Sequence, residues 1–195
     1  MKILQLKESE RIKESLRSLT EEFIKEYPYY STWIEKNKAT FKDGTRVVYE
    51  PKDNEKTVGY MMVHFSTQKC VKVNGIYVFP DFQKRGYAKK ALLQVLEGLR
   101  KQNYDYAFIQ TRTHNKIVVH MFDTLHFDVI GQNYHKIEKQ LNWVAVYDLN
   151  KKEILMKCVI LQHSFIRVFP RIDMQLGKVS NDTLFFSKFS NIISK

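Results

Sequence analysis

The stretch "VFPDFQKRGYAKKALLQVLEGLR", residues 78–100, joins a glycine-bearing turn to an apolar helical stripe. Its central segment gathers four cations around Gly86, namely Lys84, Arg85, Lys89 and Lys90. The start of a helix carries a partial positive charge, so acidic side chains rather than basic ones stabilise it. The unpaired backbone N–H groups at such a helix start attract anions. The segment therefore predicts an anion site, with a solvated surface turn as the alternative interpretation.

The residues on either side of this turn predict a strand, a helix and a second strand. Apolar side chains recur at helical spacing after the glycine, at Ala88, Ala91, Leu92, Val95, Leu96 and Leu99. Before the turn, "KCVKVNGIYVF" is typical of a strand that Pro80 ends, and "YDYAFIQTRT" is typical of the next strand. A strand over 71–79, a helix over 85–101 and a following strand form a βαβ-like unit, which indicates the α/β class.

The rest of the chain predicts further elements of both kinds. Helical periodicity covers 9–27, which Pro28 closes, then "YYSTWIEKNK" and 115–125. The expected strands are "MKILQL", "TRVVYEP", "TVGYMMVHFST", "FDVIGQ", "LNWVAVYDL" and "EILMKCVIL". From His163 onward the pattern weakens. We therefore expect one domain over 1–161 and an extension over 162–195, packed on the domain or at a dimer contact.

Composition restricts the partners and the compartment. The 195 residues carry a net charge of +11, from 32 Lys and Arg against 21 Asp and Glu, which favours an anionic partner. The start "MKILQLKESE" becomes charged too soon for a signal peptide, and no apolar run reaches the roughly 20 residues of a spanning helix. We expect a cytoplasmic protein without a membrane partner. Cys70 and Cys158 lie in apolar runs, which predicts buried thiols, and the histidines show no metal-ligand spacing.

The turn motif resembles that of a known family. The sequence contains no G-x-x-x-x-G-K-[ST] and no G-x-G-x-x-G, which excludes two common phosphate loops. Gln83-Lys84-Arg85-Gly86-Tyr87-Ala88 instead resembles the acyl-CoA signature [Arg/Gln]-x-x-Gly-x-[Gly/Ala] of the GNAT superfamily of N-acetyltransferases. "GIYVFPDF" upstream, the helical stripe and the spacing over 115–127 resemble the family as well. The resemblance implies a GNAT fold, with a mixed sheet of about six or seven strands, flanking helices, and strands 4 and 5 splayed around CoA.

The resemblance also implies roles for individual residues. The residues that it implies for binding acetyl-CoA are Ile76, Val78, Gln83, Lys84, Arg85, Gly86, Tyr87, Ala88, Asn115 and Phe122. The amides of the signature loop would hold the pyrophosphate. Ile76 and Val78 would pair their backbone with the pantetheine arm, and the Val78 amide would polarise the thioester carbonyl. Asn115 and Phe122 would line the far side of that arm. Acetyl-CoA is then the co-substrate, and no metal is implied.

Two positions depart from the family pattern. Phe122 stands where family members often have a tyrosine that protonates the leaving thiolate, and Lys72 stands where some have a glutamate base. His114, at the end of a predicted strand, is a candidate base, and an exposed loop histidine is the alternative. Tyr134 is a second catalytic candidate, although strand tyrosines usually serve packing. Since a thiol pKa is about 8.5, a thiolate can leave unaided at a cost of roughly 2 kcal/mol.

The function that follows is transfer of an acetyl group from acetyl-CoA to a primary amine. One alternative is a GNAT-fold module that binds CoA with little or no turnover, which the residues at 72 and 122 favour. Another is an acetyltransferase with an RNA- or ribosome-associated acceptor, motivated by the net charge. Nucleic acid is not favoured, because the lysines are spread along the chain. A homodimer is compatible with the sequence. The stretch "EYPYYSTW", residues 26–33, predicts either a cap on the acceptor groove or core packing.

Overall fold

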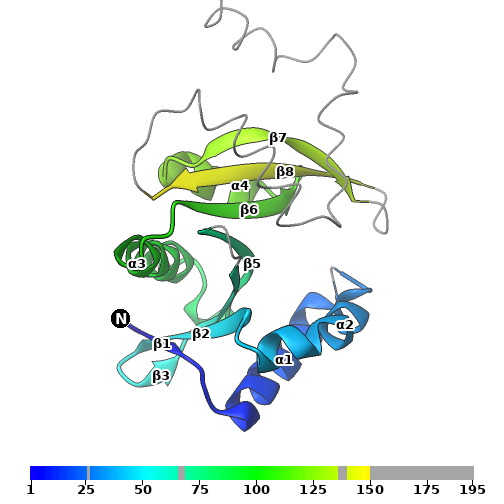
Figure 1. The fold of residues 1–195 in the computed structure, drawn as a ribbon, viewed down its shortest axis with the longest axis vertical. Helices are drawn as coiled ribbons and strands as arrows, with labels where there is room; N and C mark the ends of the chain where they lie inside the picture. The colour runs from blue at the N-terminus through cyan, green and yellow to red at the C-terminus, as the bar shows by residue number, and fades with distance from the viewer. Residues whose placement is uncertain (26, 66–68, 136–139, 150–195) are drawn as a thin grey trace, which may run out of the picture. The chain divides into compact units, whose positions relative to one another are not determined.

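The computed structural model describes residues 1–25, 27–65, 69–135 and 140–149 (Figure 1). This part of the chain contains β1 (Lys2–Gln5), α1 (Ser9–Phe23), α2 (Tyr30–Lys42), β2 (Arg46–Asp53), β3 (Lys56–Thr57), β4 (Gly59–Phe65), β5 (Cys70–Val78), the 3₁₀ helix η1 (Pro80–Phe82), α3 (Tyr87–Lys101), β6 (Tyr106–Arg112), α4 (Lys116–Thr124), β7 (Asp128–His135) and β8 (Gln140–Asp148). It divides into two compact units. The first comprises residues 1–109 and 148–149, and the second comprises the described residues between 110 and 147.

The first unit is built on a mixed sheet with the strand order β1-β2-β4-β5-β6 and with β3 paired to β2. The β1–β2, β2–β4 and β4–β5 pairs are antiparallel. β5 and β6 are parallel, with Cys70 opposite Tyr106 and Val73 opposite Ile109, and α3 connects them. Parallel neighbours require a crossover connection, and the helix supplies it. The expected α/β class and its βαβ unit are confirmed.

Helices cover both faces of this sheet, which explains why its central strands are apolar on both sides. Val48 of β2 lies opposite Met62 of β4 on the face that α1 and α2 cover. Val47 and Val63, one residue along each strand, point to the other face. α3 packs against β5 and β1 and buries its stripe, Ala91, Leu92, Val95, Leu96 and Leu99. These layers fix the turn between β5 and α3.

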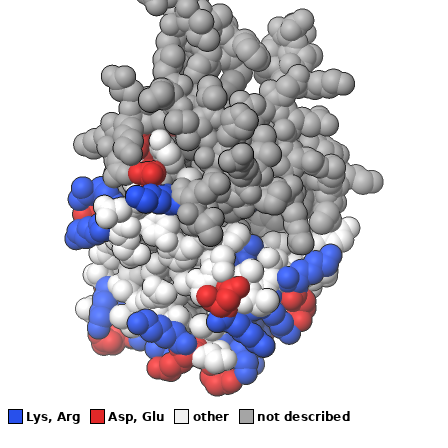
Figure 2. All heavy atoms as spheres, viewed as in Figure 1, with Lys and Arg blue, Asp and Glu red and all other residues white. Residues whose placement is uncertain are grey.

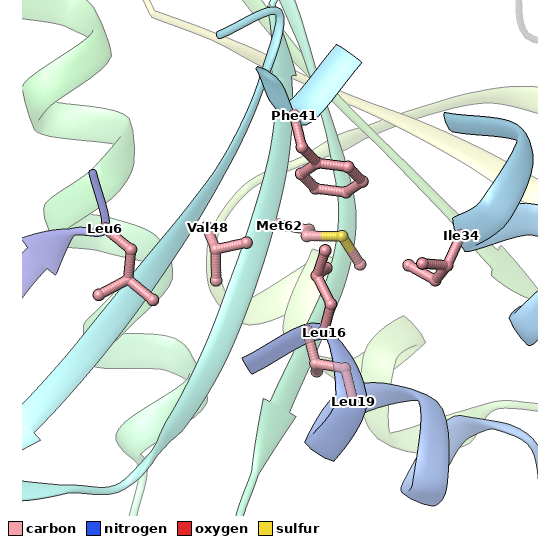
Figure 3. Close-up of a cluster of buried hydrophobic side chains, with 7 residues drawn as sticks. All are labelled: Leu6, Leu16, Leu19, Ile34, Phe41, Val48 and Met62. Atoms are coloured by element: carbon pink, nitrogen blue, oxygen red, sulfur yellow. The ribbon is translucent and has the colours of Figure 1, made fainter. Parts of the chain in front are cut away.

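A hydrophobic cluster joins α1 and α2 to the sheet (Figure 3). Its buried members are Leu6, Leu16, Leu19, Ile34, Phe41, Val48 and Met62, and partly buried Phe23, Tyr30, Trp33 and Tyr77 are among the side chains that pack against it. Full burial of one such aliphatic or aromatic side chain contributes about 1.5–3 kcal/mol. The cluster therefore holds the helical hairpin against the strands.

The second unit contains the end of β6, α4 and the strands β7 and β8. The two strands form an antiparallel pair with Asp128 opposite Val146 and a register shift between Val129 and Gly131. Phe122 of α4 is fully buried, and its ring lies 5.6 Å from that of Phe127. Aromatic packing therefore anchors α4 within this unit.

The structure corrects some predicted boundaries. The helix expected over 9–27 ends at Phe23, and the helix expected over 85–101 begins at Tyr87. The described residues form eight strands, one of them the two-residue β3, because positive φ angles at Asn54 (46°) and Glu55 (64°) turn the chain back after β2. The predicted strand "EILMKCVIL", Cys158 and the extension over 162–195 lie outside the described residues.

Candidate functional site

The turn between β5 and α3 has an alternating backbone conformation. β5 ends at Val78, one turn of 3₁₀ helix follows, and α3 begins at Tyr87. Lys84 has a φ of 59° and Gly86 a φ of 77°, whereas Arg85 between them stays at negative φ. Left-handed residues next to right-handed ones turn successive N–H groups toward a common concave side, which favours an anion. The turn therefore has the backbone geometry of an anion site.

The start of α3 lacks the groups that normally complete a helix N-terminus. Gly86 is its N-cap and forms no side-chain capping bond, and the first turn contains no acidic residue. A Cβ added to Gly86 would meet nothing within 4 Å, so open space faces this residue. Gln83, Lys84 and Arg85 are exposed. The free N–H groups of a helix start usually find a partner, and here the fitting partner is an anion from solution.

Side chains hold the turn in place. The Gln83 side-chain amide donates a 2.9 Å hydrogen bond to the Val78 carbonyl, which ties the turn to the end of β5. The Tyr87 hydroxyl donates to the Asp53 carboxylate, and this bond raises the pKa of Tyr87. The rings of Phe82 and Tyr87 meet edge to face with centroids 6.0 Å apart. These contacts leave the backbone amides near Gly86 for a ligand.

An open hollow of about 350 Å³ lies beside the start of α3. Its lining residues are Met1, Asp53, Tyr87, Lys90, Leu93 and Gln94. The Lys90 ammonium lies 5.9 Å from the centroid of the Tyr87 ring. The hollow therefore offers an aromatic surface and a cation on the helix side of the turn.

The strand that leads into the turn has one edge without a recorded strand partner in the first unit. The parallel register with β6 ends at Val73 opposite Ile109, while β5 continues for five more residues to Val78. On the other side, β4 still pairs with this segment, with Ile76 opposite Met61 and Val78 opposite Gly59. An extended ligand can add to such an edge as a further strand.

Aromatic side chains of α1 and α2 pack around the end of β5. The ring of Phe23 lies 5.9 Å from that of Tyr77 and 5.0 Å from that of Tyr30, and Tyr30 stacks on Trp33 at 5.6 Å. Tyr30 and Trp33 pack against the hydrophobic cluster, so core packing is the observed role of this part of "EYPYYSTW". Tyr29 is 54% exposed.

Glu22 was not identified from the sequence. Its carboxylate forms an ion pair with Lys25 at 3.2 Å and a hydrogen bond with Tyr77, and both bonds lower the pKa of Glu22. Burial and the bond to Glu22 raise the pKa of Tyr77 to about 12, so its hydroxyl stays protonated at neutral pH. Glu22 follows Leu19 by one helical turn and precedes Phe23. Because Leu19 lies on the buried face of α1, this spacing places Glu22 beside that face, and it is the signal in the sequence that could have identified the residue.

Basic side chains form a row across three neighbouring strands. Arg46 of β2 lies opposite His64 of β4, and His64 lies opposite Lys72 of β5. Burial, followed by the charges of Arg46 and Lys72, lowers the pKa of His64 to about 4. Burial, followed by the charge of Arg46, lowers the pKa of Lys72 to about 7. Lys72 is thus a desolvated amine that is only partly protonated at neutral pH, rather than a carboxylate base.

The remaining predicted residues belong to the second unit. His114 is exposed, in the turn between β6 and α4. The Asn115 side-chain oxygen accepts a 3.2 Å bond from the Val118 amide, which makes Asn115 the N-cap of α4. Phe122 is a core residue of this unit. Tyr134 lies in β7 opposite Leu141, and its side chain lies outside the described part of the structure. Their implied roles stay predictions.

Two other kinds of feature are absent from the described residues. Within 1–25, 27–65, 69–135 and 140–149, no three His, Cys, Asp or Glu side chains gather as a metal site would require. Over the same ranges, no helix combines the length and the apolar character needed to cross a membrane.

Comparison with known families gives one match to the sequence. The model of the "Acetyltransferase (GNAT) family" matches residues 10–127, which is more than half of the chain. The match includes β5, the turn and α3. No curated protein sequence matches the chain.

Solved structures share the fold at low sequence identity. A spermidine N-acetyltransferase chimera of the Vibrio cholerae enzyme SpeG and hSSAT aligns with a TM-score of 0.61 and 15% identity, over 77% of this chain and 98% of that one. The ribosomal-protein-S18-alanine N-acetyltransferase of Escherichia coli aligns at 0.50 and 14%, over 60% and 79%. A GNAT family acetyltransferase of Elizabethkingia anophelis with acetyl-CoA bound aligns at 0.50 and 13%, over 54% and 77%. These likenesses support the fold.

Proposed function

The chain belongs to the GNAT acetyltransferase family, and on this premise we propose that it is an N-acetyltransferase that uses acetyl-CoA to acetylate a primary amine. The observation that carries the proposal is the turn at Gly86. The φ angle changes sign from residue to residue along its backbone, no side chain caps the helix start, and exposed cations surround it. A pyrophosphate satisfies all three features at once.

The proposed binding mode uses the turn and the edge of β5 together. The amides from Lys84 to Ala88 bind the pyrophosphate, and Lys84 and Arg85 add opposite charge. The pantetheine arm lies along the edge of β5 that continues past Val73, where it pairs with the backbone of Ile76 and Val78. The order of the elements supports this arrangement, because the edge of β5 and the turn follow each other directly in the chain.

The reaction is a direct attack of the amine on the acetyl thioester. The nitrogen lone pair forms a C–N bond to the carbonyl carbon, the C–S bond breaks, and the sulfur leaves as a thiolate. The nitrogen loses a proton to solvent or to a base. An amine with a pKa near 10.4 is neutral in about one molecule in 2,500 at pH 7, whereas an α-amine near 7.8 is neutral in about one in seven. An α-amine therefore needs less help from the protein.

The acceptor is proposed to approach on the face of β5 that carries Tyr77. Glu22 supports this direction, because its carboxylate lies beside the Tyr77 hydroxyl and can attract an ammonium group. Two of the structural relatives are named for amine acceptors, spermidine in one and the alanine of ribosomal protein S18 in the other. A primary amine is the acceptor class that these observations support.

A CoA-binding module without turnover is the second candidate, because Phe122 has no proton to give to the leaving thiolate and is buried in its own unit. The two candidates differ in whether free CoA thiol is released. An RNA-associated acceptor receives less support, since acidic and basic side chains are interspersed on the face that Figure 2 shows.

The test is release of free CoA thiol in the presence of a panel of amines. The panel contains a peptide with a free N-terminus, a lysine peptide with a blocked N-terminus, and polyamines. We expect thiol release above the hydrolysis rate with at least one amine, together with a melting temperature that acetyl-CoA raises. Stabilisation by acetyl-CoA without thiol release under any acceptor would favour the module. No stabilisation at saturating acetyl-CoA would contradict both.

A further inference from the structure

Arg46, the first residue of β2, is a buried cation with an unusual set of partners. It is 9% exposed, and its guanidinium uses all three nitrogens as donors. Nε donates to the Thr40 hydroxyl at 2.9 Å, Nη1 to the Asn74 side-chain oxygen at 2.9 Å, and Nη2 to the Asn37 side-chain oxygen at 3.0 Å. The guanidinium carbon also lies 4.8 Å from the centroid of the Trp33 ring. These partners belong to α2 and β5, so one side chain connects three elements.

None of these partners carries a charge, although a buried cation usually has an anionic one. Burial lowers the pKa of Arg46 to about 10, so the group is still charged at neutral pH. Desolvation of an arginine costs free energy that an apolar residue would avoid. The planar arrangement of its donors, rather than attraction to an opposite charge, therefore explains a buried arginine with three neutral acceptors. Only a guanidinium offers several donors in a fixed planar fork.

The α2 side of this network is also held by hydrogen bonds within the helix that do not involve Arg46. The Asn37 amide group donates to the Trp33 carbonyl at 2.7 Å, which turns its oxygen toward Arg46. The Thr40 hydroxyl donates to the Asn37 carbonyl at 2.6 Å, so its oxygen lone pair accepts from Arg46. The hydrogen bonds of Asn37 and Thr40 to the backbone of α2 leave their oxygens as the acceptors for Arg46. The helix thus holds the guanidinium in a single orientation.

The β5 side of the network is a bulge. Met62 of β4 lies opposite Gly75, and the next residue, Val63, lies opposite Val73. In this register Asn74 is the extra residue and faces no residue of β4. It also lies one residue past the last recorded pair with β6, Val73 with Ile109. The bond to Arg46 therefore fixes Asn74 at the point where the ladders on both sides are interrupted.

We propose that Arg46 is a positioning residue, which acts through Asn74 to fix the bulge in β5 and so to align the Ile76 and Val78 backbone with the acetyl thioester. The inference rests on the proposed function, since the thioester is its object. A bulge re-aims the residues that follow it. Only one residue, Gly75, separates Asn74 from Ile76 along the strand. A bulge held by three directional bonds keeps those backbone groups in one place, and loose positioning lowers the rate of a bimolecular transfer.

The experiment compares Arg46→Lys and Asn74→Ala with their double variant and with the control Val48→Ala. Lysine keeps the charge but cannot serve three acceptors in a plane. Val48 is fully buried on the same strand and face, so its truncation loosens the core without touching the network. Hydrogen exchange of the β5 amides in the free protein is measured first, and then kcat and KM with the best amine of the panel.

We expect at least tenfold faster exchange over 75–78 and at least tenfold lower kcat in Arg46→Lys, with the KM for acetyl-CoA changed less than threefold. Asn74→Ala should reproduce both effects. The double variant should lose no more than either single variant, because both remove one shared interaction. Val48→Ala should lower the melting temperature while its kcat and its exchange over 75–78 stay near wild type, measured well below melting.

Several results would overturn the inference. Unchanged exchange or unchanged kcat in Arg46→Lys would do so, and so would additive losses in the double variant or an equal loss of kcat in Val48→Ala. If the wild-type chain acetylates no amine, the proposed function fails, and exchange over 75–78 alone then decides whether Arg46 fixes the bulge.

Discussion

Cationic side chains cluster in two places in the chain, and the two groups differ in their exposure to solvent. The four cations around Gly86 are exposed and have no acidic residue beside them in the first turn of α3. The row of Arg46, His64 and Lys72 crosses the sheet, with Arg46 buried and His64 and Lys72 half-buried. Burial lowers the pKa of all three side chains, and neighbouring cations lower those of His64 and Lys72 further. Exposed cations remain available for a ligand, whereas the buried guanidinium of Arg46 is bonded to other parts of the fold.

The comparison teaches where positive charge indicates function. A net charge of +11 says only that an anionic partner is favoured. The exposed group coincides with an uncapped helix start and a left-handed glycine, so charge and backbone point to the same ligand. In the row that crosses the sheet, the arginine instead donates to three protein acceptors. Three predictions test this difference.

The largest effect is expected from reversing charge in the exposed group. Lys84→Glu with Arg85→Glu should weaken acetyl-CoA binding about 100-fold, because two attractive charges become repulsive beside a pyrophosphate. Calorimetric titration measures the affinity. The matched control reverses Lys36 and Lys38, which are exposed on α2, and should change affinity less than threefold. Equal losses in both double variants would show that only net charge matters.

A smaller effect is expected in the row of Arg46, His64 and Lys72, and it is an effect on stability. Lys72→Met keeps the length of the side chain and removes the desolvated charge, so it should raise the free energy of unfolding at pH 7 by roughly 2 kcal/mol. Denaturant titration measures it. Lys36→Met, on the exposed face of α2, should change stability little. A destabilised Lys72→Met protein at pH 7 would contradict the desolvated state of Lys72.

The pH dependence of this gain has a definite sign. The folded pKa of Lys72, about 7, lies below its ordinary value of 10.5, so the unfolded chain binds more protons between those values. Wild-type stability therefore rises through this side chain as pH increases from 7 to 10.5, while the methionine variant lacks the contribution. The advantage of Lys72→Met should be full at pH 7 and below and should shrink toward pH 10. A stability difference between Lys72→Met and wild type that stays constant over this pH range would show that the gain comes from packing.

The smallest effect compares two glycines in the same conformation. Gly44 and Gly86 both have a φ of 77°, and an added Cβ would meet nothing within 4 Å at either. Alanine at each should therefore cost a similar free energy of unfolding, about 1 kcal/mol. Only Gly86→Ala should weaken acetyl-CoA, by about tenfold, because only there does the backbone approach the ligand. An equal affinity for both variants would show that the ligand binds elsewhere.

The local signals of the sequence predict most of the described elements. The period-3.6 stripe from Ala91 to Leu99 is buried in α3, and the strand before Pro80 ends at Val78. The predicted helix start at 85 is two residues early, since Gly86 at positive φ cannot be helical. The helix predicted to 27 ends at Phe23, four residues before Tyr27, the position whose backbone Pro28 restricts.

The Arg46 network could not be predicted in the same way. Its partners are separated by up to 28 residues, and each of them alone resembles a surface polar residue. The bulge did leave a signal, because apolar positions fall at Val71 and Val73 and then shift by one to Ile76 and Val78. Local periodicity therefore predicts elements and irregularities, whereas a hydrogen-bond network depends on which strands become neighbours.

The most direct test of the central claim is a pair of calorimetric titrations of the wild-type chain. One uses acetyl-CoA and the other S-acetylpantetheine, which has the same thioester and arm but lacks the pyrophosphate and the phosphorylated adenosine attached to it. If the turn at Gly86 binds the pyrophosphate, acetyl-CoA should bind at least 100-fold more tightly, a difference of about 2.7 kcal/mol. Equal affinities, or no detectable binding of acetyl-CoA, would contradict the account.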